Sequence, residues 1–264
     1  LGGLVSLLLV RPLLSGGFSE ANSANIRIAM VLTAGFFCVA AIPTFLFLRE
    51  RATPRVQKAT LSTYLEVGLK GPLRTILALP QLARFLAVFI LFSCGLSTVI
   101  AFSAIYAKQT VGFTPDDLIG LFLVVQISAA AGALSFGWIQ DKIGAKRSIQ
   151  ITLLVWIIVV LGAYMATTRT TFMAVALLAG LGIGSLQSAS RGLVGLFAPA
   201  SRSGEVFALW ALSYRVASAV GPLAFGQISE WSGSQRTAML ATGVFFLLGL
   251  IGMTTINEAV GTPA

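Results

Sequence analysis

The sequence predicts an all-α integral membrane protein. Of its 264 residues, 56% are hydrophobic and only 10% are charged, whereas about 25% are charged in ordinary soluble domains. The mean hydropathy is +0.91, and the 27 glycines lie largely within long apolar stretches. Seven of these stretches approach or exceed the length of about 20 residues that a helix needs to cross a bilayer. This pattern excludes a soluble globular enzyme, a disordered chain and a secreted disulfide-rich domain.

The predicted spans follow one another along the chain at residues 27–48, 84–107, 117–140, 149–167, 171–198, 204–228 and 235–256. A further apolar run at residues 1–10 is half a span long and lacks the methionine and basic segment of a signal peptide. We therefore interpret it as the end of a helix whose start is missing. The expected organisation is the end of an N-terminal helix bundle (1–48), a connector (49–82), a six-helix bundle (83–257) and a tail (258–264).

The distribution of lysine and arginine predicts the orientation, because cytoplasmic loops carry an excess of both. One set of alternate loops carries eleven: Arg49, Arg51, Arg55, Lys58, Lys70, Arg74, Arg84, Lys142, Lys146, Arg147 and Arg202. The other set carries five: Arg11, Arg27, Lys108, Arg169 and Arg236. Loops 49–82, 141–148 and 199–203 are therefore predicted to be cytoplasmic. The net charge of +9 is spread between apolar runs, so we expect no nucleic-acid partner.

The long connector contains an amphipathic stretch at residues 60–80, which Gly71-Pro72 interrupts. Such a stretch predicts a helix that lies on the inner membrane surface and bridges two bundles. A partner-binding or regulatory segment is the alternative.

The turn after the span at 117–140 reads GWIQDKIGAKR, from Gly137 to Arg147. We expect Gly137 to let two helix backbones approach closely and Gly144 to supply the turn conformation. Asp141 lies at a helix C-terminus, where a negative charge is unfavourable, so it should have a partner elsewhere. Three cations are expected to hold the turn in the cytoplasm: Lys142, Lys146 and Arg147. This GxxxDxxGxKR pattern resembles the signature loop of the major facilitator superfamily; an ordinary tight basic turn is the alternative.

Two further stretches resemble the vacuole effluxer branch of that superfamily, the autophagy-related protein 22-like transporters. They are the glycine-rich run LGIGSLQSASRGLVGLFAP (181–199) and the following stretch at 204–236. The resemblance implies a major facilitator-type fold in which this chain supplies the C-terminal six-helix bundle plus the last one and a half helices of the N-terminal bundle. Where the family usually carries Asp-Gly-x-Gln-Thr in helix seven, this chain has Cys94-Gly95-Leu96-Ser97-Thr98.

Polar side chains inside the spans are the candidate substrate-pathway residues, because a charge at that depth is costly unless it is paired or hydrated. Arg215 lies near the middle of its span, one turn before Ser218. It is expected to contact a substrate or gate, or to pair with an acid of the missing half. Arg191 is nearer the cytoplasmic side and could snorkel or join an inner gate. Gln187 and Gln126 could orient a polar solute or bond a neighbouring helix.

Glycines inside the spans are expected to shape the bundle. Gly180, Gly182 and Gly184 lie in an apolar span with no preceding strand, so they predict close helix packing rather than a nucleotide-binding loop. Gly221-Pro222 predicts a kink, because proline removes one helical hydrogen bond.

The expected function is secondary active transport, as an efflux-type permease working by alternating access. The family resemblance suggests a small solute such as an amino acid, moved across a bacterial cell membrane. Its expected partners are that solute, the lipid bilayer and the N-terminal half of the same chain. Histidine is absent, and Cys38 and Cys94 form no CxxC unit, so we expect no catalytic residue, metal or cofactor. An intramembrane enzyme and a non-transporting receptor or assembly fragment are the alternatives.

Overall fold

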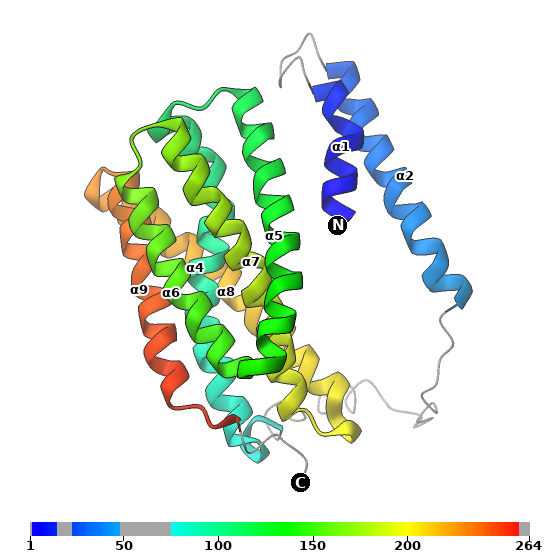
Figure 1. Cartoon of the computed structure of the whole chain (residues 1–264), viewed down its shortest axis with the longest axis vertical. Coiled ribbons are helices and arrows are strands. Elements are labelled where there is room, and N and C mark those ends of the chain that lie inside the picture. The colour runs from blue at the N-terminus through cyan, green and yellow to red at the C-terminus, as the bar shows by residue number, and fades with distance from the viewer. Residues whose placement is uncertain (1, 15–22, 48–74, 259–264) are drawn as a thin grey trace, which may run out of the picture.

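The computed structural model describes residues 2–14, 23–47 and 75–258, and its described regular structure is helical throughout (Figure 1). The α-helices are α1 (Gly2–Leu14), α2 (Ser23–Phe47), α4 (Pro80–Tyr106), α5 (Pro115–Ile143), α6 (Ala145–Met165), α7 (Arg169–Phe197), α8 (Ser203–Ser232) and α9 (Gln235–Thr254). A π-helical turn, η2 (Ala107–Val111), extends α4, and a 3-10 turn, η3 (Ala200–Arg202), precedes α8.

Seven helical segments are long and apolar enough to cross a membrane, and they coincide with the seven predicted spans. The all-α membrane class is therefore confirmed. The boundaries shift where turns are shorter than expected. Helix α6 begins at Ala145, four residues before its predicted start, because Gly144 alone separates it from α5. Helix α8 continues beyond its predicted end to Ser232. The amphipathic stretch predicted at residues 60–80 lies largely outside the described residues.

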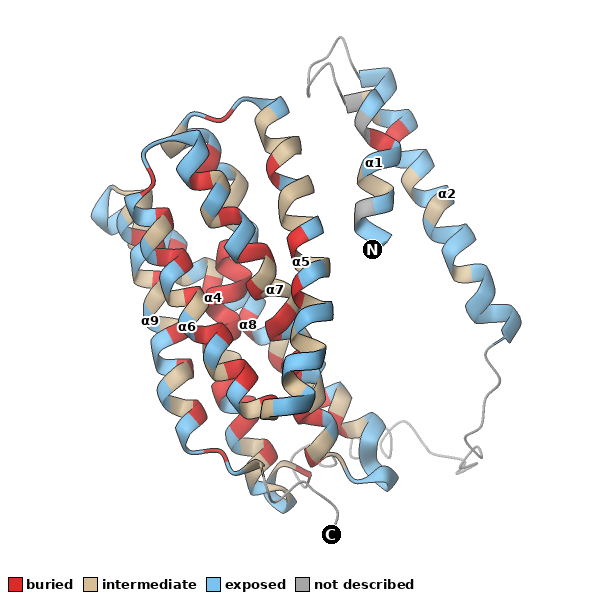
Figure 2. Ribbon diagram, in the orientation of Figure 1, coloured by how far each residue is buried: buried red, intermediate tan, exposed pale blue. Residues whose placement is uncertain are grey.

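Helices α4 to α9 form a bundle, and α1 and α2 form a separate antiparallel pair beside α5 (Figure 1). Helix α4 is the most enclosed of the candidate spans, with 67% of its apolar window buried. Helix α2 is exposed along most of its length (Figure 2). The pair meets the bundle where the Gln126 amide of α5 lies against Gly3 of α1.

Glycines bring α5 and α7 into backbone contact. A Cβ atom added at Gly184 would lie 1.9 Å from the carbonyl oxygen of Ala129, and one at Gly180 would lie 2.6 Å from that of Val125. From the opposite helix, a Cβ at Gly132 would lie 2.3 Å from the carbonyl oxygen of Leu181. Any side chain at these positions would force the helices apart, so the seam depends on small residues.

A similar contact joins α4 to α8. A Cβ at Gly221 would lie 2.2 Å from the carbonyl oxygen of Cys94. The Ser97 hydroxyl donates a hydrogen bond across the same interface to the carbonyl of Ala217, at 3.2 Å. The segment that departs from the family's usual helix-seven pattern therefore packs against α8.

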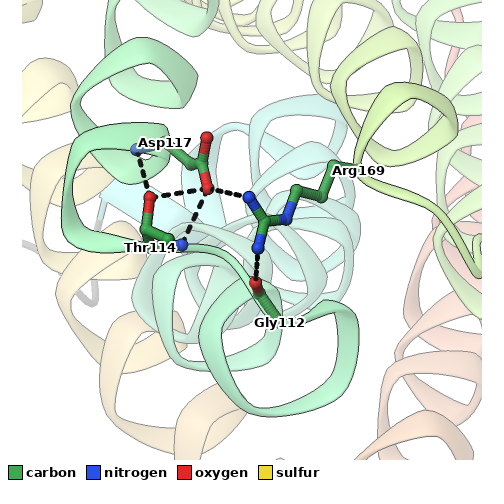
Figure 3. A network of polar contacts seen from close by, with 4 residues as sticks. All are labelled: Gly112, Thr114, Asp117 and Arg169. Carbon is green, nitrogen blue, oxygen red and sulfur yellow. Dashed lines mark hydrogen bonds and ion pairs between the residues drawn. The ribbon is translucent and has the colours of Figure 1, made fainter.

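At one end of the bundle, Asp117 fastens the start of α5 to the start of α7 (Figure 3). Its carboxylate accepts hydrogen bonds from the backbone N–H and hydroxyl of Thr114, at 2.8 and 2.7 Å, and forms an ion pair with Arg169 at 2.7 Å. Arg169 also donates to the carbonyl of Gly112 at 2.7 Å. Asp117 and Asp116 both lie in the first turn of α5, where negative charge suits the helix dipole.

The opposite end is fastened by Glu258 and Lys146. The Glu258 carboxylate accepts hydrogen bonds from the first backbone N–H groups of α6, and the Lys146 ammonium donates to the carbonyls of Ile256 and Thr254, at 2.5 and 3.4 Å. At the same end, the Thr75 hydroxyl donates to Glu205 in the first turn of α8, at 2.7 Å. Segments 141–148 and 199–203, predicted on one side of the membrane, thus lie at the same end of the bundle.

Candidate functional site

A cavity of about 370 Å³ opens between α4, α7 and α8 in the middle of the bundle. We call it the central pocket; its lining is Phe89, Phe92, Ser93, Leu96, Leu186, Gln187, Ser190, Trp210, Ala211, Tyr214, Arg215 and Ser218. The α8 members recur at intervals of three or four residues, so they share one helix face. Ligand sites of helical bundles are commonly built in this way, from facing helices.

The central pocket brings together three of the five predicted substrate-pathway residues, namely Gln187, Arg215 and Ser218. The Arg215 side chain is exposed near the middle of α8, and its guanidinium makes no hydrogen bond or ion pair within the described part of the chain. The Ser218 hydroxyl donates to the carbonyl of Arg215 at 2.8 Å. Arg215 is therefore the charged side chain among the described residues that line the pocket.

Four polar residues of the pocket are absent from the predicted set: Ser93, Ser190, Trp210 and Tyr214. The Ser93 and Ser190 hydroxyls and the Trp210 indole N–H are buried, and none of them has a hydrogen-bond partner among the described residues. Their helical spacing gives a partial indication in the sequence, since Ser190 lies three residues after Gln187 and Trp210 precedes Tyr214 and Ser218 by four and eight. Nothing comparable marks Ser93.

Aromatic rings form one wall of the pocket. Phe89 packs edge-on against Phe92, with ring centroids 5.3 Å apart, and lies 5.6 Å from the Trp210 ring. The Arg191 guanidinium lies 5.7 Å from the centroid of the same indole, in a cation–π contact. Arg191 therefore lies next to the pocket without lining it.

A second cavity, about 910 Å³, runs as a groove between α5 and α7. Gln187 lines both this groove and the central pocket, whereas Arg191 and Gln126 line the groove and not the central pocket. Gln126 also borders an apolar cavity of about 530 Å³ between α1, α2 and the bundle. The structure thus separates Gln126 from Arg215.

The signature-loop residues divide between the groove and the turn. Gly137 and Asp141 line the groove. A Cβ added at Gly137 would meet nothing within 4 Å, so the close helix approach expected there is not seen among the described residues. The backbone contacts between α5 and α7 instead fall one to three turns earlier along α5. Asp141 is exposed and has no hydrogen bond or ion pair within the described ranges.

The turn itself has a conformation that favours glycine, because Gly144 has φ +86°. Lys142 and Arg147 are exposed, whereas Lys146 reaches the end of α9. Among the packing glycines, Gly180 and Gly184 lie on the α5 seam and Gly182 lies against the Trp156 indole. Helix α8 continues through Gly221 and Pro222 without a break.

The chain is similar in sequence to an MFS-type transporter and to autophagy-related proteins. Over 241 residues the chain is 22% identical to the uncharacterized MFS-type transporter YxiO of Bacillus subtilis, covering 91% of this chain and 56% of that protein. Over 261 residues it is 24% identical to autophagy-related protein 22-1 of Aspergillus niger, and the match covers 90% of this chain and 42% of that protein. The chain therefore spans about half the length of these relatives.

A solved structure shares the fold. This structure is the crystal structure of a bacterial homologue of the human lysosomal transporter Spinster, in an inward-facing and unoccupied conformation. The alignment covers all of this chain and 66% of the homologue's chain, with a TM-score of 0.57 and 17% sequence identity. The fold is therefore of the major facilitator type. The family of vacuole effluxers similar to Atg22 matches the sequence over residues 2–263. The chain belongs to this family of MFS-type membrane transporters.

Proposed function

We propose that this chain is the C-terminal portion of a secondary active, efflux-type permease that moves a small solute by alternating access. The observation that carries the proposal is the central pocket, where Arg215, without an ion pair among the described residues, and Gln187 line a cavity of about 370 Å³. Major facilitator transporters bind solute near the membrane midplane between two helix bundles. The family resemblance suggests an amino acid as the solute.

The proposed partners are the solute, the lipid bilayer and an N-terminal bundle of the same chain. Resemblance to a Bacillus protein supports a bacterial cell membrane. The end that carries Gly144 and η3 is proposed to be cytoplasmic, because the basic loops gather there. In a variant without Cys38 and Cys94, Lys142→Cys should react with a membrane-impermeant maleimide only from inside, and Arg169→Cys only from outside. Reaction of both from one side would refute this orientation.

Transport is tested by flux in proteoliposomes. The purified full-length protein should move at least one member of a panel of amino acids and small organic acids under a proton, sodium or solute gradient. Arg215→Ala should abolish that flux, whereas Arg202→Ala, at the exposed turn before α8, should leave it near normal. The absence of flux for every solute and gradient would refute the proposal, and normal flux in Arg215→Ala would make that residue structural.

A further inference from the structure

Two buried serines of this bundle differ from every other buried serine and threonine that the structure describes. Serines in membrane helices usually satisfy their hydroxyl by bonding a carbonyl one turn earlier. Ser185 and Ser213 do so, donating to the carbonyls of Leu181 and Leu209 at 2.9 Å each. Ser93 and Ser190, which are 0% and 1% exposed, have no partner among the described residues.

These exceptions share one location. Ser93, Ser190 and Trp210, whose indole N–H is likewise buried and unpartnered, all line the central pocket. Trp156, which carries the remaining unpartnered buried atom of the described residues, lies apart from it, against Gly182. Buried polar groups without partners are rare in folded proteins, so their concentration at one cavity indicates a ligand that satisfies them.

The chemistry of the set indicates the charge of that ligand. An indole N–H and a guanidinium can only donate hydrogen bonds, and a serine hydroxyl can donate or accept. No aspartate or glutamate is present among the described residues that line the pocket. A group with several acceptor atoms and a negative charge complements these donors, and a carboxylate can accept two parallel bonds from one guanidinium.

The remaining walls indicate the rest of the ligand. Phe89, Phe92, Leu96 and Leu186 give the cavity an apolar side. A cavity of this size, with apolar walls and few polar groups, suits a small molecule that carries one polar end.

We infer that the central pocket binds the carboxylate of a small apolar organic acid. Arg215 supplies the charge, Ser93, Ser190 and Trp210 donate hydrogen bonds, and the apolar wall holds the hydrocarbon part. This inference rests on the proposed function and narrows it, because recognition runs through the carboxylate and requires no ammonium group. An amino acid and the corresponding acid without its amino group should then both enter.

Binding is tested by titration calorimetry of the full-length protein in lipid nanodiscs. The probes are 4-methylpentanoate and 3-phenylpropanoate, the neutral amide of each, and leucine and phenylalanine. At least one acid should bind, and its amide should bind at least about tenfold more weakly. Hydrogen bonds to charged groups are stronger than neutral ones by a free energy that corresponds to about a tenfold difference in affinity. An amide as tight as its acid, an amino acid more than about tenfold tighter than its acid, or no binding by either acid would overturn the inference.

Variants assign the residues. Arg215→Gln should weaken acid binding by about tenfold or more, and Ser190→Ala and Trp210→Phe should each weaken it severalfold through loss of one donor. Ser213→Ala is the matched control, since Ser213 is buried on α8, bonds its own helix and does not line the pocket. If Arg215→Gln fails to fold, Ser190→Ala and Trp210→Phe still show whether the pocket residues bind the acid. Equal effects of Ser190→Ala and Ser213→Ala would overturn the assignment.

Binding and flux separate the two proposals. Acid binding that depends on Arg215 without flux of any solute would refute transport and leave the carboxylate site standing. Flux of a solute by a protein that binds neither acid would refute the carboxylate site and leave transport standing.

Discussion

The carboxylate of Glu258 accepts a hydrogen bond from the backbone N–H of Ala145 at 2.7 Å, although 113 positions separate the two residues. Its second oxygen accepts from the N–H of Lys146 at 3.3 Å. The first N–H groups of a helix have no partner inside the helix, and the helix dipole makes this end attractive to a negative charge. The segment after α9 therefore caps α6, which Gly144 itself cannot do because it lacks a side chain.

Removal of this cap should lower stability. Glu258→Ala is expected to cost about 0.5–2 kcal/mol, the usual range for loss of a helix N-cap. The measurement is the thermal unfolding midpoint in detergent. Glu230→Ala is the control, since this exposed side chain makes no hydrogen bond within the described residues. Equal midpoints for the two variants would show that the cap does not contribute to the stability of the fold.

The glycine seam between α5 and α7 should tolerate no added carbon. Gly184→Ala places a Cβ 1.9 Å from a backbone oxygen, so the helices must separate, at a cost of about 1–3 kcal/mol for an overpacked core. Gly195→Ala lies on the same helix, where nothing is within 4 Å of the added atom, and alanine favours helix by up to about 1 kcal/mol over glycine. Folded yield and thermal midpoint should therefore both fall in Gly184→Ala, and both should hold or rise in Gly195→Ala. A drop of the same size in both variants would contradict the tight seam.

Asp117 should matter more than its neighbour Asp116. Asp117→Ala removes the bonds to Thr114 and the ion pair with Arg169 at once, so it should lower the thermal midpoint further than Asp116→Ala. Because the ion pair is exposed, the part of the effect that depends on Arg169 should shrink at high salt. A double-mutant cycle with Arg169→Gln at low and high salt measures that part. A coupling that does not depend on salt would contradict an exposed ion pair.

Asp141 should influence which side of the membrane the protein opens to. Its carboxylate lies exposed in the groove at the C-terminus of its own helix, an unfavourable place that a partner outside the described residues would offset. Asp141→Asn is therefore expected to shift the full-length protein toward the inward-open form. Gln187→Cys, introduced without Cys38 and Cys94, should then react faster with an impermeant maleimide from the cytoplasmic side. Asp116→Asn, at the other end of α5, is the control, and unchanged labelling in Asp141→Asn would count against the role.

The seven spans and the polar positions of Arg215 and Gln187 inside them were predictable, because apolar length and rare polar residues within it are visible in the sequence itself. That the two side chains share one pocket depends on the packing of α7 against α8, which no local pattern specifies. Ser93 could not be singled out, and only the spacing from Gln187 pointed to Ser190, since a serine in an apolar helix is normally satisfied by its own backbone. Glu258 could not be assigned either, because the two ends of its contact with α6 lie 113 positions apart in the sequence. Gly137 meets no neighbouring helix among the described residues, because one spacing pattern does not fix which glycine meets a neighbour.

The position of Trp210 gives the molecule an optical reporter of its own. Of the four tryptophans of this sequence, Trp138 and Trp231 are each 80% exposed and Trp156 is fully enclosed. Quenchers dissolved in lipid or in water should therefore reach the first two, and solutes should leave the emission of the third unchanged. Among these four residues, the emission that still changes when a solute is added is then that of Trp210, beside Arg191 and the cavity. Occupancy can be followed in unlabelled protein by a shift in emission wavelength, in real time and without any attached dye.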